Sequence, residues 1–522
     1  MQRYFNITAN CRPKEHYMVD LTSRLEEIKQ MIDKGQYFTI NKGRQFGKTT
    51  TLRALEGYLS NDYIVISLDF QNEMSSQKFE SEYIFSFTLA RLFKRKLKLA
   101  QVLDNFKDEI QDLDETISVL KENFGLVELF QHMSDICAAS EKPIVLIIDE
   151  VDSASNNQVF LDFLAQLRGY YINRDRRPTF QSVILAGVHD IRNLKQKIRP
   201  DAEHKHNSPW NIASEFKVEM SFLPVDIATM LTDYENDHHT GMDIADISQK
   251  IYDYTSGYPV LVSNICKLID EDIHEWTAKG ITQAVNIITE KRTPLLESLF
   301  NKIEDYPELD NIIRRLLFSG ESTSFTIMDD TLNLAVMYGF IRNENRKAVI
   351  ANKIFEKVLY ERYLSQMDID EPFYHKGADD KQQFIQNGRL NMARVLERFA
   401  VHFNDLYSDQ SETFLEKDGR RLFLLYLRPI INGVGNYYIE SETRNSRRTD
   451  VIVDYLGEQF IIEMKIWRGE EYNSRGEEQL SDYLDYYHIS KGYMLSFSFN
   501  KSKEIGIHEI TLGDKTIIEA LV

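Results

Sequence analysis

The chain has 522 residues, of which 43% are hydrophobic and 27% are charged, and it contains only 11 prolines and 23 glycines. This composition excludes long disordered, collagen-like or low-complexity segments, and the length suggests about three or four domains. The net charge of −19 disfavours a protein that coats nucleic acid through bulk charge, although a local basic patch and metal ions can still engage DNA.

The three cysteines, Cys11, Cys137 and Cys266, lie far apart and form no C-x-x-C pair. They cannot build a disulfide framework or a zinc knuckle, so we expect small buried thiols in a reducing cytosol. The start of the chain lacks the apolar region of a signal peptide, and no run approaches the roughly 18 apolar residues of a transmembrane helix. We therefore expect a cytoplasmic protein with no membrane partner.

The first third of the chain alternates strand and helix patterns. Strands are expected at residues 37–41, 63–70, 143–149 and 182–188, and helices at 48–60, 81–103 and 160–173. The strand at 143–149 is nearly all apolar, as in strands that are buried on both faces of a parallel sheet. This alternation predicts an α/β domain with a parallel sheet over residues 1–220.

After residue 220 the pattern becomes helical. Residues 221–300 predict a helical lid, with helices at 227–234, 243–255 and 260–271. Residues 301–366 combine helices with short strand patterns at 325–327 and 348–352, as in a winged-helix domain, and the acidic stretch 367–383 predicts a linker. Residues 384–522 predict a second, smaller α/β unit, with helices at 382–407 and 477–487 and strands at 437–440, 451–455, 459–467 and 492–499.

A phosphate-binding pattern lies where the first predicted strand passes into a helix. The sequence there is Gly43-Arg44-Gln45-Phe46-Gly47-Lys48-Thr49-Thr50, in the context that a P-loop requires. Backbone N–H groups can wrap a triphosphate, Lys48 can reach the β- and γ-phosphates, and Thr49 can place its hydroxyl on Mg²⁺. The usual spacing puts a glycine where Lys42 stands, so we expect either a positive φ at Lys42 or a shifted loop.

An apolar strand further along the chain ends in Asp149 and Glu150. Asp149 can hold Mg²⁺ through water, and Glu150 can polarise the water that attacks the γ-phosphate. The alternative is that the two patterns are an unrelated turn and strand end. Because each stands at the end of a strand and in the expected order, we interpret them together as an ATP–Mg²⁺ site that hydrolyses ATP.

On these motifs, residues 1–365 resemble the AAA-like ATPases of the signal-transducing and origin-recognition branch of the P-loop superfamily. In that branch a segment placed like residues 12–25 contacts adenine, and a lid motif G-x-P, matched by Gly257-Tyr258-Pro259, brings its proline to the nucleotide. A simple turn between helices is the alternative for this tripeptide. Relatives often assemble into homo-oligomers in which a neighbour's arginine completes the site. The sensor candidates are His189 and Asp190, and the candidate arginine fingers, among which the sequence does not select, are Arg174, Arg176, Arg177 and Arg199.

A second group of polar residues lies in the smaller α/β unit. Asp450 starts one strand of a predicted hairpin and Glu463 lies near the end of the other, so the two can meet. Glu463 and Lys465 are two residues apart and point to the same face. Two carboxylates can bind Mg²⁺, and a lysine can orient or deprotonate a water for attack on phosphorus. Their strand is otherwise apolar, so metal binding or catalysis explains them better than an exposed charge pair does.

This pattern resembles the D-x(n)-E-x-K signature of the PD-(D/E)XK nuclease superfamily. Residues 419–500 look like the nuclease-like domain that often follows AAA-like ATPases in bacteria. Gln479 and Tyr483 resemble the Q-x-x-x-Y motif of recombination-type nucleases, which helps to orient substrate and active site. Ordinary helix-surface residues are the alternative for Gln479 and Tyr483, and also for Glu397, a weaker metal-ligand candidate. Glu442 stands eight residues before Asp450, where relatives often carry an acidic residue. The basic run 444–448 could hold phosphates or form a solvated hairpin tip.

The predicted fold class is α/β: a P-loop NTPase parallel sheet with a helical lid and a winged helix, plus a C-terminal α/β domain of the restriction-endonuclease-like type. The resemblance implies a bacterial protein that binds and hydrolyses ATP with Mg²⁺ and whose nuclease domain cleaves nucleic acid, in particular DNA, under nucleotide control. The main alternative is a nucleotide-dependent signalling or assembly switch whose C-terminal domain binds nucleic acid or protein without cleavage. A DNA translocase ranks last, because no helicase motifs accompany the two nucleotide-site patterns.

Overall fold

The computed structural model describes residues 3–8, 10–154, 157–188, 210–318, 324–326, 329–366, 372–407, 416–431, 434–438, 451–467, 477, 480–481, 483–485, 487, 489–499 and 505–522. The chain divides into two compact units. Unit 1 comprises Met1–Arg3, Thr8–Ser221 and Met337–Gly339, and unit 2 comprises Tyr4–Ile7, Phe222–Val336 and Phe340–Val522. Among the helices of the described ranges, none combines the length and the apolar character that crossing a membrane requires.

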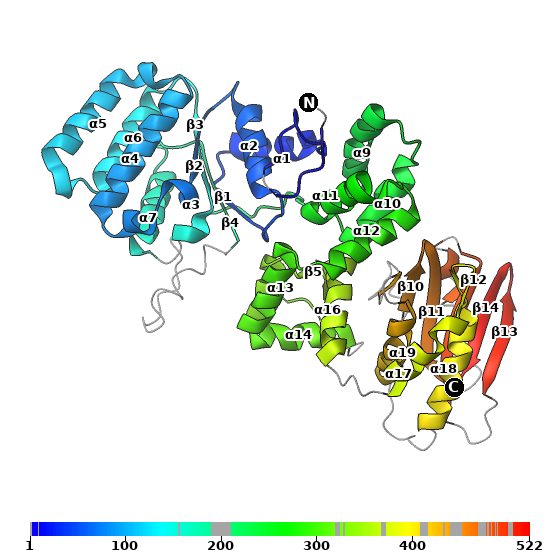
Figure 1. Cartoon of the computed structure of the whole chain (residues 1–522). Coiled ribbons are helices and arrows are strands. Elements are labelled where there is room, and N and C mark those ends of the chain that lie inside the picture. Colours follow the sequence, from blue (N-terminus) through cyan, green and yellow to red (C-terminus); the bar gives the residue numbers. More distant parts are fainter. Residues whose placement is uncertain are drawn as a thin grey trace. The chain divides into compact units, whose positions relative to one another are not determined.

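Unit 1 is a parallel four-stranded sheet with helices on both faces (Figure 1). Its strands run in the order β1-β4-β3-β2, so β4 separates the strand of the phosphate-binding pattern from the strand that ends in Asp149. The strands are β1 (Phe38–Asn41), β2 (Ile64–Asp69), β3 (Ile144–Asp149) and β4 (Ser182–Gly187). The longer helices are α1 (Thr22–Asp33), α2 (Lys48–Leu59), α4 (Glu82–Leu99), α5 (Lys107–Leu120), α6 (Leu126–Ala139) and α7 (Gln158–Ile172), and α3 (Phe70–Glu73) is a single turn.

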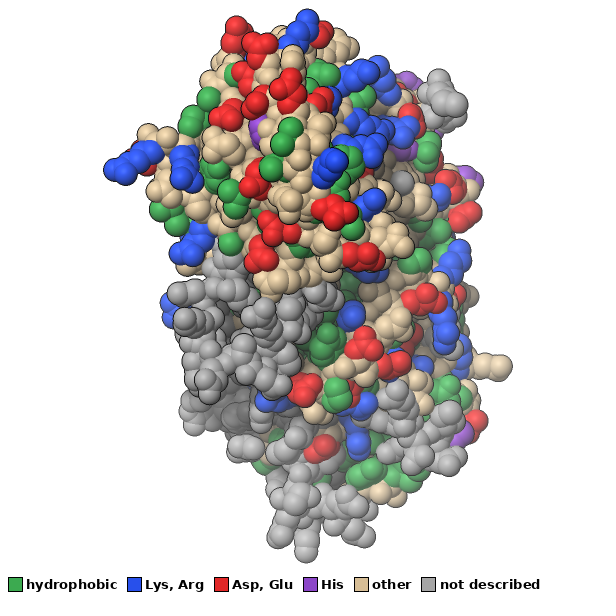
Figure 2. All heavy atoms as spheres, turned by 90° about the vertical axis from the view of Figure 1, so that its left-hand side faces the viewer, with side chains coloured by type: hydrophobic (Ala, Val, Ile, Leu, Met, Phe, Trp, Pro, Cys, Tyr) green, Lys and Arg blue, Asp and Glu red, His purple; other side chains and the backbone are tan. Residues whose placement is uncertain are grey.

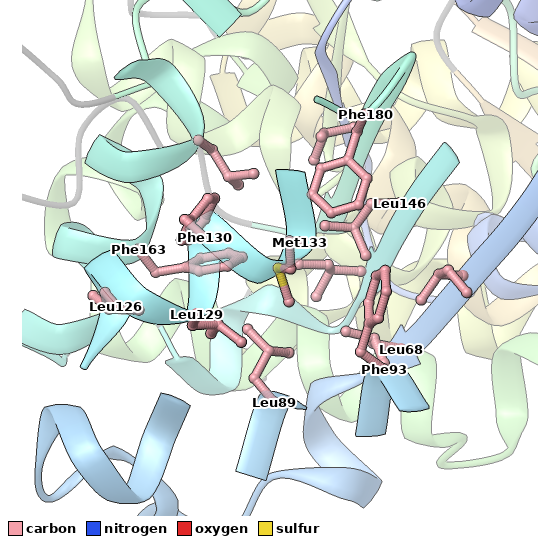
Figure 3. Packing of buried hydrophobic residues seen from close by; sticks show 14 of the residues in the cluster. Leu68, Leu89, Phe93, Leu126, Leu129, Phe130, Met133, Leu146, Phe163 and Phe180 are labelled. Atoms are coloured by element: carbon pink, nitrogen blue, oxygen red, sulfur yellow. The ribbon is translucent and has the colours of Figure 1, made fainter. Parts of the chain in front are cut away.

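Alternation along the buried strands divides the core of unit 1 into two layers. All six residues of β3 are buried. Leu146 and Ile148 pack into a cluster with α4, α6 and α7, while Val145 and Ile147 pack with α1 and α2 on the other face. Figure 3 shows part of the first cluster, including Leu146, Met133 and Phe93. This core fixes the sheet edge at which the polar strand ends lie.

The first part of unit 2 is helical. Its elements are α9 (Pro224–His238), α10 (Ile244–Thr255), α11 (Pro259–Leu268), a π-helical turn (Ile269–Ile273), α12 (Ala278–Glu290), α13 (Pro294–Asp305), α14 (Pro307–Phe318), α15 (Asp330–Met337), the hairpin β5 (Ile341–Glu344) and β6 (Lys347–Ile350), and α16 (Lys353–Gln366). Residues 325 and 326 of the predicted strand 325–327 form no strand, and residue 327 lies outside the described residues. The preceding residue, Ser324, forms an isolated bridge with Lys347. The partner of β6 is instead β5, which the sequence analysis did not identify.

The second part of unit 2 is a mixed six-stranded sheet in the order β13-β14-β12-β11-β10-β9. Strands β11, β12 and β14 are parallel, whereas β10 is antiparallel to β9 and to β11. The strands are β9 (Gly435–Tyr438), β10 (Val451–Tyr455), β11 (Glu458–Ile466), β12 (Lys491–Phe497), β13 (Gly506–Leu512) and β14 (Lys515–Leu521). The helices are α17 (Pro372–Asp380), α18 (Met392–Tyr407) and α19 (Glu416–Ile431), and β7 (Ile385–Gln386) pairs with β8 (Arg389–Leu390).

The segment predicted as a linker is largely occupied by α17. Its last residue, Asp380, is buried and accepts a hydrogen bond from the Tyr426 hydroxyl at 2.9 Å, and its carboxylate lies 2.7 Å from Nε2 of His402. The acidic composition does not indicate a linker here, because this carboxylate is hydrogen-bonded inside the fold rather than solvated. The helix predicted at 382–407 likewise begins only at Met392, after the β7–β8 hairpin.

Two glycines in the helical part of unit 2 both have a positive φ, but only Gly257 is tightly packed. It has a φ of +71°, and a Cβ built on it would lie 2.0 Å from the carbonyl oxygen of Phe222, whereas Gly241 has a φ of +76° and nothing within 4 Å. Gly241→Ala should therefore cost about 1–2 kcal/mol of unfolding free energy from backbone strain alone. Gly257→Ala should cost about 1–3 kcal/mol more, because backbone must move. Urea unfolding of both variants measures the difference, and equal losses would contradict the tight packing.

Candidate functional site

The phosphate-binding turn joins β1 to α2. Its left-handed residues are Gln45, with a φ of 60°, and Gly47, with a φ of 76°. Lys42 is not among the positive-φ residues, so the first of the two conformations expected for the missing glycine is wrong. Gly43 is needed for another reason, because a Cβ there would come within 2.8 Å of the carbonyl oxygen of Tyr338, which belongs to the same unit.

Lys48 points into the turn. Its side chain is buried, and Nζ donates hydrogen bonds to the carbonyl oxygens of Lys42 at 2.8 Å and Gly43 at 3.0 Å. Burial lowers the pKa of Lys48, and the nearby carboxylates, Glu150 foremost, oppose that shift. Charged phosphate oxygens would be stronger partners for this ammonium group than neutral carbonyl oxygens are.

Thr49 and Asp149 come together at the carboxyl edge of the sheet. The Thr49 hydroxyl donates to Asp149 Oδ2 at 2.7 Å, and Asp149 Oδ1 accepts the Glu150 N–H at 2.9 Å. Burial raises the pKa of Asp149. A hydroxyl and a carboxylate in contact are hard oxygen ligands of the kind that Mg²⁺ prefers, so the residues present fit this ion.

Glu150 follows directly and carries a strained backbone, with a φ of 54°. Burial raises the pKa of its carboxyl group, and the charge of Asp149 adds to that rise. Strained, pKa-shifted residues at strand ends are typical of functional sites. The arrangement brings Lys48, Thr49, Asp149 and Glu150 to one place, as the sequence analysis expected.

Two acidic residues of this site were not identified from the sequence. Asp69 ends β2 directly beside Asp149 in the parallel register, and its charge contributes to the raised pKa values of Asp149 and Glu150. Asp152 accepts the N–H of Val188 at 2.5 Å and so ties the end of β4 to the segment after β3. The sequence did contain a signal for Asp69, because the apolar strand Ile64–Asp69 ends in an aspartate, as β3 does.

The arginine candidates of unit 1 differ in their partners. Arg174 donates to the carbonyl oxygen of Gly35 at 2.9 Å and lies over the Tyr171 ring, and Arg177 lies over the Tyr170 ring. Arg176 is exposed beside Asp175. A role for any of the three as an arginine finger stays a prediction. The candidates that lie outside the described residues are His189, Asp190 and Arg199.

Pro259 is the first residue of α11 in unit 2, and Tyr258 precedes it as the N-cap. Proline fits this position because the first helical N–H has no partner inside the helix. Its approach to a nucleotide stays a prediction.

The carboxylate–lysine site lies on β11. Glu463 and Lys465 are 2% and 9% exposed, and Lys465 Nζ lies 3.6 Å from Glu463 Oε1. The two charges that the sequence predicts in a nearly apolar strand are therefore both buried and paired. In the β10–β11 hairpin, Val451 pairs with Ile462, and Asp450 lies just outside the described residues.

The neighbouring strands add two polar residues to this face of the sheet. Ser496 on β12 pairs with Lys465, and its hydroxyl donates to Glu519 of β14 at 2.6 Å. Both Ser496 and Glu519 are buried. Burial, and then the charge of Glu519, raises the pKa of Glu477. A glutamate inside an apolar run was the signal shared by β11 and β14, but the sequence analysis did not identify strands beyond residue 499.

The remaining candidates for the nuclease site differ in their surroundings, and some lie outside the described residues. Tyr483 is buried and stacks on Tyr487, with ring centroids 6.3 Å apart. Glu397 pairs with Arg394 at 2.5 Å on α18, a helix that contacts β13 and β14. No group of three histidine, cysteine, aspartate or glutamate side chains in the described part of the chain could hold a metal ion. Gln479, Glu442 and the run 444–448 lie outside that part.

The face of the molecule shown in Figure 2 carries acidic and basic side chains side by side. Of the side chains visible on that face, lysines and arginines gather toward one upper side but are interrupted by acidic groups. This mixture of charges agrees with the net charge of −19.

The chain matches one family model and several solved structures. The model of a family described as "AAA-like domain" matches residues 14–366. The Walker-type ATPase of Pyrococcus abyssi is 14% identical, with a TM-score of 0.47 and coverage of 68% of this chain and 99% of its own. The ORC2 protein of Aeropyrum pernix, in ADPNP–ADP complexes, is 10% identical, with a TM-score of 0.33 and coverage of 69% and 97%. The ORC1 protein of that organism, in complex with DNA, is 11% identical, with a TM-score of 0.28 and coverage of 67% and 95%. No curated protein matches the chain.

Nucleotide binding should depend on the buried ammonium group of Lys48. Lys48→Met removes a charged donor of hydrogen bonds to phosphate and should weaken ATP affinity roughly 10- to 100-fold. Lys42→Met is the matched control, because Lys42 holds Lys48 only through its backbone carbonyl. Titration with a fluorescent ATP analogue measures both variants. Equal affinities for Lys48→Met and Lys42→Met would contradict the assignment.

Proposed function

Because the chain belongs to the AAA-like domain family over residues 14–366, we propose that unit 1 binds ATP together with Mg²⁺ and hydrolyses it. The observation that carries this proposal is the contact between Thr49 and Asp149, 2.7 Å apart, next to the buried Lys48. Thr49 and Asp149 would hold Mg²⁺, which supplies neutralisation of phosphate charge when bound. Lys48 binds and orients the β- and γ-phosphates.

Glu150 is the residue that we propose for the attacking water. Its carboxylate accepts a hydrogen bond from that water and orients it toward the γ-phosphate, which phosphoryl transfer requires. Since burial raises the pKa of Glu150, its carboxyl group is a better proton acceptor than an exposed glutamate.

The substitution Glu150→Gln separates binding from turnover. It keeps the size and polarity of the side chain but removes the basic carboxylate, so we expect ATP affinity within about threefold of wild type and hydrolysis at least roughly 100-fold slower. Steady-state phosphate release and nucleotide titration measure the two quantities. Hydrolysis at the wild-type rate would sink the proposed role of Glu150, and a loss of affinity as large as in Lys48→Met would assign it to binding instead.

We further propose that the C-terminal part of unit 2 is a Mg²⁺-dependent nuclease that cleaves DNA. The supporting observation is the buried, paired Glu463 and Lys465 on a strand that is otherwise apolar. The proposal requires the β10–β11 register to continue by one residue beyond Val451 and Ile462, which would bring Asp450 opposite Glu463. Asp450 and Glu463 would then hold Mg²⁺, and Lys465 would position the attacking water.

The sharpest test of this second activity uses the lysine. Lys465→Ala should abolish Mg²⁺-dependent cleavage of linear, circular or single-stranded DNA, because the attacking water loses its orienting group. Lys491→Ala is the control, since this lysine stands at the exposed start of β12 on the same sheet. Cleavage is followed on gels with and without ATP and with EDTA.

A second candidate function remains a nucleotide-dependent switch whose C-terminal sheet binds nucleic acid or protein without cutting it. The net charge of −19 favours this candidate. It gains support if wild type hydrolyses ATP but cleaves none of the three DNA forms. Retained cleavage in Lys465→Ala would instead contradict the assignment of the nuclease site.

A further inference from the structure

Within unit 2, the helical part and the C-terminal sheet share a buried polar interface. Asp454 lies inside β10, and the hydroxyl of Tyr254 on α10 donates a hydrogen bond to its carboxylate. Both side chains are buried. Burial raises the pKa of Asp454, and the hydrogen bond from Tyr254 is the largest effect that opposes this rise. A carboxylate in this position is costly unless it keeps its donor.

A second set of bonds lies at the neighbouring strand β9. Lys357 on α16 donates to Asn286 Oδ1 on α12 at 2.9 Å and also donates to the side-chain oxygen of Asn436 on β9. The Asn286 amide donates to the backbone oxygen of Val434 at 3.3 Å. Burial lowers the pKa of Lys357 to about 8. Three helices are thus bonded to one edge of the sheet, the edge nearest to α10 and α12 in Figure 1.

Apolar contacts close the same interface. The rings of Tyr360 on α16 and Tyr437 on β9 meet edge to face, with centroids 6.2 Å apart. In the turn after β10, a Cβ built on Gly457 would lie 3.2 Å from the backbone nitrogen of Lys279 on α12. The surface is therefore packed as well as bonded, which favours one discrete arrangement over a sliding contact.

One of the places at which the chain passes from unit 1 into unit 2 lies near this interface in the sequence. Phe222 directly follows Ser221, the last residue of a unit 1 segment, and its N–H donates to the carbonyl oxygen of Gly257 at 2.8 Å. Gly257 lies in the turn directly after α10, the helix that carries Tyr254. Phe222 is therefore tied to the turn after α10 by one backbone hydrogen bond and by close backbone packing.

We propose that five buried polar residues form an interface lock that couples the helical part of unit 2 to strands β9 and β10. The five residues are Tyr254, Asp454, Asn286, Lys357 and Asn436. Through this lock, nucleotide binding in unit 1 changes the stability of β10, the strand that leads into the nuclease site. Strand β10 begins directly after Asp450 and pairs with the strand that carries Glu463. The regulatory consequence rests on the proposed nucleotide binding, whereas the lock itself does not. A discrete contact of this kind can transmit a two-state change, because it is either closed or broken.

Amide hydrogen exchange on the full chain tests the lock. Tyr254→Phe removes one hydroxyl from α10, and we expect exchange in β9 and β10 to rise about tenfold, the effect of losing one hydrogen bond to a buried charge. Exchange in β12 and β14 should stay unchanged, because they lie away from this edge. Tyr252→Phe is the matched control on the same helix, where the side chain is only half-buried. Asp454→Ala, which removes the acceptor, should likewise raise exchange in β9 and β10, and combining it with Tyr254→Phe should add little.

The outcomes separate the lock from general stability. Equal exchange in Tyr254→Phe and Tyr252→Phe, or a uniform rise across all six strands, overturns it. For the regulatory part, a non-hydrolysable ATP analogue should change exchange in β10 of wild type by about threefold or more, and Tyr254→Phe should lose this response at unchanged analogue affinity. A response in both proteins, or in neither while the analogue binds, overturns the coupling. Absence of analogue binding contradicts the ATP-binding proposal instead, and absence of DNA cleavage contradicts only the nuclease proposal.

Discussion

The parallel sheet of unit 1 places the carboxyl ends of all its strands at one edge, and the nucleotide site depends on that constraint. With β4 between β1 and β3, the turn after β1 and the acidic end of β3 still face each other closely enough for Thr49 and Asp149 to bond. The buried side chains on both faces of β3 hold the strand in register. Polar groups at this edge are therefore positioned by apolar packing behind them.

Both candidate sites bury charge, and in both the charge has a partner. Lys48 is held by backbone carbonyl oxygens, and Lys465 is held near Glu463. Isolated buried charges would cost several kcal/mol each, so such residues persist where they bind ligands or stabilise each other. The backbone strain at Glu150, a non-glycine residue with a φ of 54°, is likewise a free-energy cost located at a candidate site. The free-energy costs of buried charge and backbone strain therefore fall at the candidate sites, and hydrophobic burial in the rest of each unit offsets them.

Unit 2 shows how composition can mislead about domain boundaries. An acidic stretch predicts a solvated linker, but Asp380 is bonded inside a cluster of helices. The helical part and the C-terminal sheet are similarly joined by buried polar side chains such as Tyr254 and Asp454. The same types of polar residue occur at internal interfaces and on the surface, so residue type alone does not separate the two. Only the hydrogen-bond partners in the folded chain distinguish them.

The α/β character of unit 1, the positions of its four strands and the residues of the phosphate-binding turn could all be predicted from the amino-acid sequence. These depend on local signals, namely apolar runs, glycine positions and strand–turn–helix order, which act over a few residues. The sequence also determined that Glu463 and Lys465 lie in an apolar strand. The tertiary structure decided which distant side chains join these sites, including Asp69 beside Asp149 and Ser496 beside Lys465. It decided the interface inside unit 2 as well, since pairing across strands and helices depends on register and packing between segments that no local pattern encodes.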